Sequence, residues 1–125
     1  MYDKELALEI LSQIYQAAQT ILQRFGPIKS ANEFTKSPEG MEKLDSICMQ
    51  LIVIGESLKN FDKVTDRSLL QVYPQVDWKS AKALRDIISH HYFKLDAEAI
   101  YEVCKNNIDE LARTIDQMIK DLSRV

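Results

Sequence analysis

The side chains of this sequence that could do chemistry gather in one segment, from Arg85 to Tyr92. Within about two helical turns the segment holds a fixed cation, a titratable imidazole and a phenol, on Arg85, His90 and Tyr92. A guanidinium forks onto phosphate oxygens, and an imidazole can give or take a proton near neutral pH. Arg85 and His90 are therefore candidate catalytic residues for phosphodiester chemistry without a metal ion.

A helix over residues 78–92 would divide this segment between two faces. The apolar face would carry Ala81, Leu84, Ile87, Ile88 and His91, and the polar stripe Trp78, Lys82, Arg85, Ser89 and Tyr92. His90 lies beside the polar stripe, one turn after Asp86, so that carboxylate could fix its tautomer and raise its basicity. His91 is expected to point toward the core.

Arg85 and His90 would diverge by about 140° on an ideal helix. The reach of arginine, or a helix that ends near His90, would narrow this gap. A second copy of the chain could also bring the two groups together, because a two-fold axis through this face would place two Arg–His sets around one phosphate. One imidazole could then take the 2′-hydroxyl proton while the other protonates the leaving 5′-oxygen, and the arginines would stabilise the phosphorane.

Each of these residues also has a purely structural interpretation. Arg85 could pair with a surface acid, and Tyr92 could be an amphipathic phenol at the edge of the core. An arginine five residues before a histidine arises often by chance, so the spacing alone favours the structural interpretation. A metal site is not expected, because the chain has two adjacent histidines and two scattered cysteines without zinc-ligand spacing. No cofactor is expected either.

The length of the chain predicts one domain over residues 1–125, because 125 residues are too few for two ordinary domains. The net charge of −3 argues against an extended nucleic-acid-binding surface, so any nucleic acid should be bound by a small local site or guided there by a partner protein. We expect a cytoplasmic protein, because no signal-peptide pattern opens the sequence and no apolar run reaches the ~20 residues of a membrane span. Cys48 and Cys104 are expected in the core, with a disulfide left open.

Apolar residues recur every three or four positions almost throughout, which predicts an all-α protein. The expected helices span residues 6–25, 38–61, 66–73, 78–92 and 97–122, with one short turn inside the connector 28–37. Ser37 is the expected N-terminal cap of the helix over residues 38–61. The middle of this helix is apolar nearly all round, so the helix should lie at the centre of the molecule. The pattern predicts a four-helix bundle with one or two short extra helices.

The segment from Arg85 to Tyr92 and the residues around it resemble a known family. The similar residues are Arg85-x4-His90-x-Tyr92, Ile54-Gly55-Glu56, Pro74-x-x-Asp77-Trp78 and His91-Tyr92-Phe93-x-x-Asp96. Together with the layout of the helices over residues 2–122, they resemble the HepT-like toxins of the HEPN superfamily. These are the partner half of toxin–antitoxin pairs that contain a minimal nucleotidyltransferase.

This resemblance implies a HEPN-like helical bundle that forms a homodimer with the motif at its interface. It implies a metal-independent endoribonuclease toxin of a type II/VII-like pair, with RNA as substrate and Arg85 and His90 as the catalytic residues. Tyr92 would be the residue that the cognate nucleotidyltransferase antitoxin AMPylates, which would give a phosphoprotein with an O-AMP-tyrosine. Asp86 and Glu56 would support the site, Glu56 either by holding Arg85 or by acting in catalysis. The alternative is a non-catalytic helical subunit that binds and regulates a nucleotidyltransferase.

Overall fold

The computed structural model describes residues 2–91 and 96–124, with His91 described by its backbone alone. The described residues form α-helices and one 3-10 helix and contain no strand, which confirms the all-α prediction. The elements are α1 (Lys4–Phe25), α2 (Asn32–Thr35), α3 (Pro38–Val64), η1 (Leu70–Val72), α4 (Trp78–His91), α5 (Ala97–Asn106) and α6 (Ile108–Ser123).

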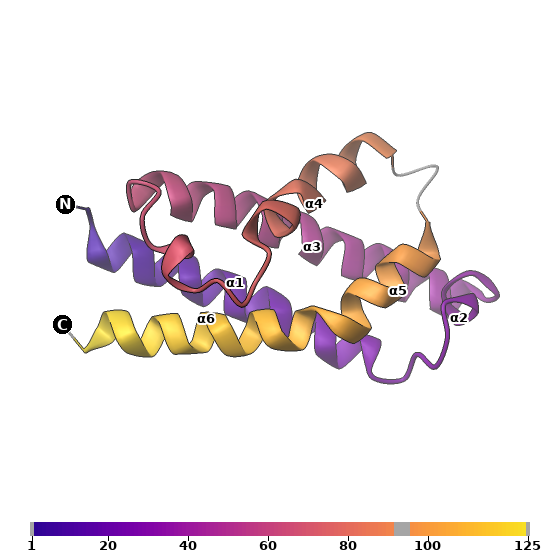
Figure 1. The fold of residues 1–125 in the computed structure, drawn as a ribbon. Helices are drawn as coiled ribbons and strands as arrows, with labels where there is room; N and C mark the ends of the chain where they lie inside the picture. The colour runs from indigo at the N-terminus through magenta and orange to yellow at the C-terminus, as the bar shows by residue number, and fades with distance from the viewer. Residues whose placement is uncertain (1, 92–95, 125) are drawn as a thin grey trace.

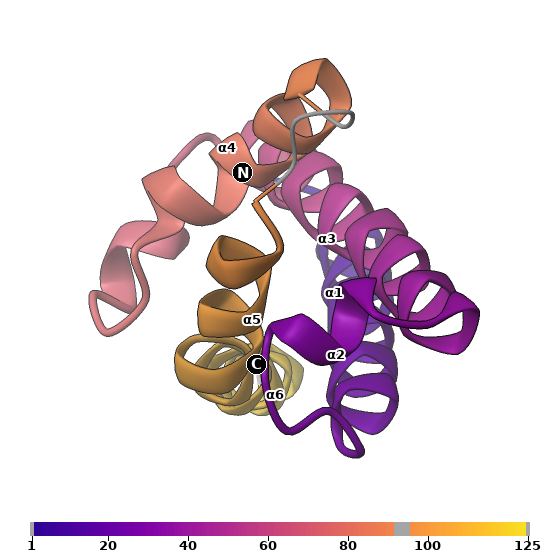
Figure 2. The same cartoon turned by 90° about the vertical axis from the view of Figure 1, so that its right-hand side faces the viewer.

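The three longest helices form the body of the molecule, with α1 between α3 and α6 (Figure 1). Helix α4 packs mainly on α3, and the end-on view shows it standing away from α6 (Figure 2). The short helix α2 lies against α3 and contacts α5. Among the described residues, no helix combines the length and the apolar character needed to cross a membrane.

The sequence predicts that α3 lies at the centre of the molecule, but α1 takes that place between α3 and α6, and α3 packs on α1 and α4 (Figure 1). Both ends of α3 are capped. The Ser37 hydroxyl accepts a hydrogen bond from the Gly40 N–H at 3.0 Å, and Pro38 opens the helix. At the other end Asp66 is left-handed, with φ of 56°, and the Arg67 N–H donates to the Asp62 carbonyl at 2.7 Å. This is a Schellman ending.

The second half of the chain departs from the prediction in two places. The helix expected over residues 66–73 is reduced to η1, because the left-handed turn that ends α3 occupies its first residues. The single helix expected over 97–122 is two helices, α5 and α6, which break at Asn107. Asparagine is a weak helix former, and the break lets α5 contact α2 while α6 runs along α1.

Both cysteines lie in the core, as predicted, and both are free thiols. Burial, followed by the nearby Asp45 carboxylate, raises the pKa of the Cys48 thiol to about 11. Burial, followed by Cys48, raises the pKa of the Cys104 thiol to about 12. Since the thiolate is the reactive form, these two residues act as apolar filler in the folded protein.

The face of α4 that packs on α3 is not the one that the apolar pattern predicts. Trp78, predicted to lie in the polar stripe, is buried, and its Nε1–H donates to the Tyr73 carbonyl at 2.8 Å. Ile87, predicted to lie on the apolar face, is 51% exposed, whereas its neighbour Ile88 is buried. Helix α4 is therefore rotated relative to the prediction, so that part of its polar stripe faces α3.

Gly55 explains this rotation. A Cβ atom placed on Gly55 would lie 2.9 Å from both the Cβ and the backbone N of Arg85, and 3.2 Å from the Lys82 carbonyl oxygen. Only a glycine allows so close an approach of the two backbones. The stripe of α4 that carries Lys82 and Arg85 therefore lies directly over α3, and both long side chains must extend sideways from the contact.

A Gly55→Ala substitution tests this close contact. The added methyl group would force α3 and α4 apart and should lower the free energy of unfolding by about 1–3 kcal/mol, measured by urea unfolding followed by circular dichroism. Gly26→Ala is the matched control, because its Cβ would come no closer than 3.4 Å to any neighbour, the carbonyl oxygen of Gln23. The control should leave stability unchanged or raise it by up to about 1 kcal/mol. Equal losses in the two variants would contradict a tight crossing at Gly55.

Candidate functional site

Arg85 lies at the crossing of α3 and α4, where its guanidinium contacts two carboxylates. Its Nε is 3.3 Å from Oε2 of Glu56 on α3, and its Nη1 is 3.1 Å from Oδ1 of Asp86, the next residue of α4. The Arg85 side chain is 42% exposed, so part of the guanidinium still faces solvent. The structure thus brings together three predicted site residues, with Glu56 in contact with Arg85.

Asp86 joins this group to a second cation. Its Oδ2 accepts a hydrogen bond from Lys59 Nζ at 2.9 Å, and its Oδ1 accepts one from Arg85. These two hydrogen bonds, the one from Lys59 first, hold the pKa of the Asp86 carboxyl below its usual value. The sequence suggested a contact between Asp86 and His90, but the carboxylate instead turns toward the cations at the helix crossing.

A third ion pair extends the same contact between α3 and α4. Lys82 Nζ lies 2.9 Å from Oδ2 of Asp62, so residues 56, 59 and 62 of α3 each pair with a residue of α4. The sequence alone did not indicate Lys59, Asp62 and Lys82 as partners. The signal that could have found them is the three-residue spacing of charges on α3, which places them along one side of that helix.

His90 lies on the opposite side of α4 from the contact with α3. Helix α4 runs through His91, so Arg85 and His90 keep the divergence of about 140° expected of an ideal helix. The His90 side chain is exposed, and it has no hydrogen bond or ion pair to another described residue. It shares the outer face of α4 with the exposed Ile87. Tyr92 lies outside the described residues, and so does the side chain of His91.

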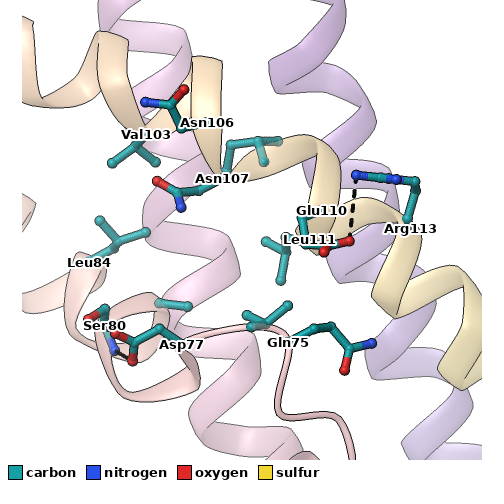
Figure 3. A pocket seen from close by; sticks show the side chains of 13 residues that line it. Gln75, Asp77, Ser80, Leu84, Val103, Asn106, Asn107, Glu110, Leu111 and Arg113 are labelled. Carbon is teal, nitrogen blue, oxygen red and sulfur yellow. Dashed lines mark hydrogen bonds and ion pairs between the residues drawn. The ribbon is translucent and has the colours of Figure 1, made fainter.

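A cavity of about 600 Å³ lies on another side of α4, and none of the predicted site residues that the structure describes lines it. It opens between the start of α4 and the junction of α5 with α6 (Figure 3). Four of its polar side chains form two pairs: Asp77 caps α4 by accepting from Ser80, and Arg113 pairs with Glu110. Leu84 and Leu111 contribute apolar surface. We therefore place the candidate site at the crossing of α3 and α4.

Comparisons with known proteins show which proteins the chain resembles. The sequence model of the family described as Ribonuclease HepT-like matches residues 14–118, which include all of α3 and α4. "Putative RNase MJ0127" of Methanocaldococcus jannaschii is 33% identical over 91 residues, which cover 73% of this chain and 69% of that protein. No solved structure gives a significant match.

Two further relatives carry related names. "Putative RNase TTE0752" of Caldanaerobacter subterraneus subsp. tengcongensis is 26% identical over 110 residues, which cover 88% of this chain and 91% of that protein. "Probable ribonuclease HepT" of Thermococcus cleftensis is 25% identical over 75 residues, which cover 60% of this chain and 64% of that protein. All three relatives are thus named as ribonucleases.

A Lys59→Gln substitution tests the charge network around Asp86. We expect the pKa of Asp86 to rise toward its usual value, because the first of its two stabilising hydrogen bonds loses its charge. Carbon-detected NMR titration of the carboxyl group measures the change. Because the pKa of Asp86 is lowered in the folded state, its ion pair with Lys59 stabilises the folded protein at pH values above the unfolded-state pKa of about 3.9. This contribution disappears as the pH falls through the folded-state pKa.

The matched control is Lys120→Gln, which removes a lysine that pairs with Asp116 on α6. It should leave the pKa of Asp86 unchanged. An Asp86 titration that is the same in wild type and in Lys59→Gln would contradict the network.

Proposed function

The chain belongs to the HepT-like ribonuclease family, and from this premise we propose that it is a metal-independent endoribonuclease whose site combines Arg85 with His90. The observation that carries the proposal is the position of the Arg85 guanidinium. Glu56 and Asp86 hold it at a fixed place on the helix crossing, while part of it faces solvent. A cation that is already oriented can stabilise the charge that develops on phosphate without reorganising at the moment of reaction.

We propose that a second copy of the chain completes the site. Arg85 and His90 diverge on one helix, so one chain alone does not point both groups at one phosphate. Ile87 is 51% exposed on the same face as His90, and a large apolar side chain so exposed is suited to an interface. A two-fold axis through this face would cover Ile87 and bring the His90 of one copy toward the Arg85 of the other.

The proposed chemistry is transfer of the RNA phosphate to its own 2′-oxygen. One His90 imidazole takes the proton of the 2′-hydroxyl as that oxygen forms a bond to phosphorus. The bond from phosphorus to the 5′-oxygen breaks, and a second, protonated His90 gives its proton to the leaving oxygen. Arg85 stabilises the additional negative charge on the phosphorane. The products are a 2′,3′-cyclic phosphate and a free 5′-hydroxyl.

We further propose that the protein acts as the toxin of a toxin–antitoxin pair, with a minimal nucleotidyltransferase as its antitoxin. The proposal rests on the resemblance of Arg85-x4-His90-x-Tyr92 to the family motif. An AMP group on Tyr92 would add bulk and a negative phosphate two residues after His90. That phosphate could take the place of the RNA phosphate at Arg85, which gives a direct physical reason for loss of activity.

The nuclease proposal predicts that the purified protein cleaves RNA in the presence of EDTA. His90→Ala should lower the cleavage rate at least 100-fold, which is the usual contribution of a general acid–base group, without changing the unfolding transition. Gel analysis of a labelled oligonucleotide measures the rate, and the termini of the products report the 2′,3′-cyclic phosphate. Unchanged cleavage by His90→Ala would overturn the assignment. No cleavage by wild type, together with tight binding to a nucleotidyltransferase, would favour the non-catalytic subunit instead.

Mixing two inactive variants separates a shared site from a site within one chain. When Arg85→Ala and His90→Ala chains form mixed dimers, the shared site holds one Arg85 and one His90, that is, one of its two cations and one of its two proton-transfer groups. Partial recovery of cleavage on mixing is therefore expected. If each variant stays inactive after chain exchange, the two groups do not act across an interface.

The AMPylation proposal predicts a change in intact mass when the protein is incubated with the partner nucleotidyltransferase and ATP. The mass should rise by whole AMP units, and the modified protein should lose RNA cleavage. Peptide mapping should place the first AMP on Tyr92, and Tyr92→Phe should abolish that addition. If Tyr92→Phe gains the same number of AMP groups as wild type, another residue is the acceptor.

A further inference from the structure

A second group of polar and charged side chains lies on α3 beside Arg85. A shallow groove of about 410 Å³ is lined by Glu56, Ser57, Lys59, Asn60 and Lys63. Glu56, Lys59 and Lys63 are spaced by three and four positions and so follow one side of the helix. Glu56 and Lys59 also belong to the ion-pair network of Arg85 and Asp86. The groove therefore begins where the candidate catalytic site ends.

The charges of the groove favour an anion. Glu56 is paired with Arg85, and Asp62, which adjoins Lys63 in sequence, is paired with Lys82. Lys63 is exposed, and no ion pair to it occurs within residues 2–91 and 96–124. The Lys59 side chain remains 39% exposed although it pairs with Asp86. Two ammonium groups, a hydroxyl and an amide thus face one groove on a chain whose net charge is −3.

We propose that this groove, called here the α3 groove, binds a second backbone phosphate of the RNA strand, with Lys63 as its principal cation. The inference rests on the proposed ribonuclease function. Lys63 lies seven residues beyond Glu56, or about 10 Å along the helix axis. Long arginine and lysine side chains can span this distance to contact phosphates one or two nucleotides apart on the same strand.

The shape and charge of the α3 groove fit a short single-stranded segment. A duplex presents phosphates over a wide area and calls for a broad basic surface, which the acidic net charge does not favour. A single strand can instead follow a narrow groove that neutralises a few phosphates. Ser57 and Asn60 would donate to phosphate or ribose oxygens there. We therefore assign unpaired RNA as the substrate class.

The test measures RNA binding separately from cleavage. In a His90→Ala background, which prevents cutting, a fluorescent single-stranded oligoribonucleotide is titrated at several salt concentrations and its anisotropy is followed. Adding Lys63→Gln should weaken binding several-fold at low salt and reduce the salt dependence by about one phosphate contact per site. Lys63→Arg should preserve both values. A duplex of the same sequence should bind more weakly than the single strand.

Lys36→Gln is the matched control, because Lys36 is an exposed lysine at the opposite end of α3, just before the Ser37 cap. It should change neither the affinity nor the salt dependence. Equal effects of Lys63→Gln and Lys36→Gln would overturn the α3 groove while leaving the nuclease proposal intact, provided that wild type cleaves RNA. A wild-type protein that neither cleaves nor binds RNA would overturn both. Unchanged unfolding of Lys63→Gln in urea shows that any loss of binding is local.

Discussion

The close contact of α3 with α4 at Gly55 determines the geometry of the candidate site. Because Gly55 has no side chain, the backbone of α4 comes so close that a Cβ there would lie 2.9 Å from Arg85. Lys82 and Arg85 therefore start from the contact itself, and their charged ends must pass along the sides of α3. There they meet carboxylates of α3, Arg85 at Glu56 and Lys82 at Asp62. A larger residue at position 55 would disturb both stability and the position of the guanidinium.

The ion pairs along this contact orient side chains more than they stabilise the fold. Their members are partly exposed, and pairs of this kind contribute about 0–1 kcal/mol each. The burial of Trp78 and Ile88 on α4 is the larger contribution. The pairs instead restrict the guanidinium of Arg85 to one place. In the proposed function, an incoming phosphate would have to compete with Glu56 and Asp86 for the guanidinium, and Lys59 would continue to balance the charge of Asp86 when Arg85 turned to the phosphate.

The sequence predicted the helical elements well and the orientation of α4 poorly. Caps such as Ser37 are local signals, and the structure confirms that one. The orientation of α4 depends on a glycine thirty residues away, which the pattern of α4 itself does not contain. For the same reason the pattern of α4 suggests His90, one turn away, as the partner of Asp86, whereas its partners are Lys59 on α3 and the neighbouring Arg85. Glu56 and Arg85 were both predicted as site residues, and they are in contact.

The continuity of α4 limits how Arg85 and His90 could act together. The buried Ile88 fixes the helix against α3 between the two residues, so no rotamer change removes a divergence of about 140°. Unwinding the last turn of α4 could redirect His90, but it would leave Ile87 exposed. Approach of a second copy to this face would cover Ile87 and supply the missing histidine together. One assumption then accounts for two observations, and this favours a site shared between chains over a local rearrangement of one.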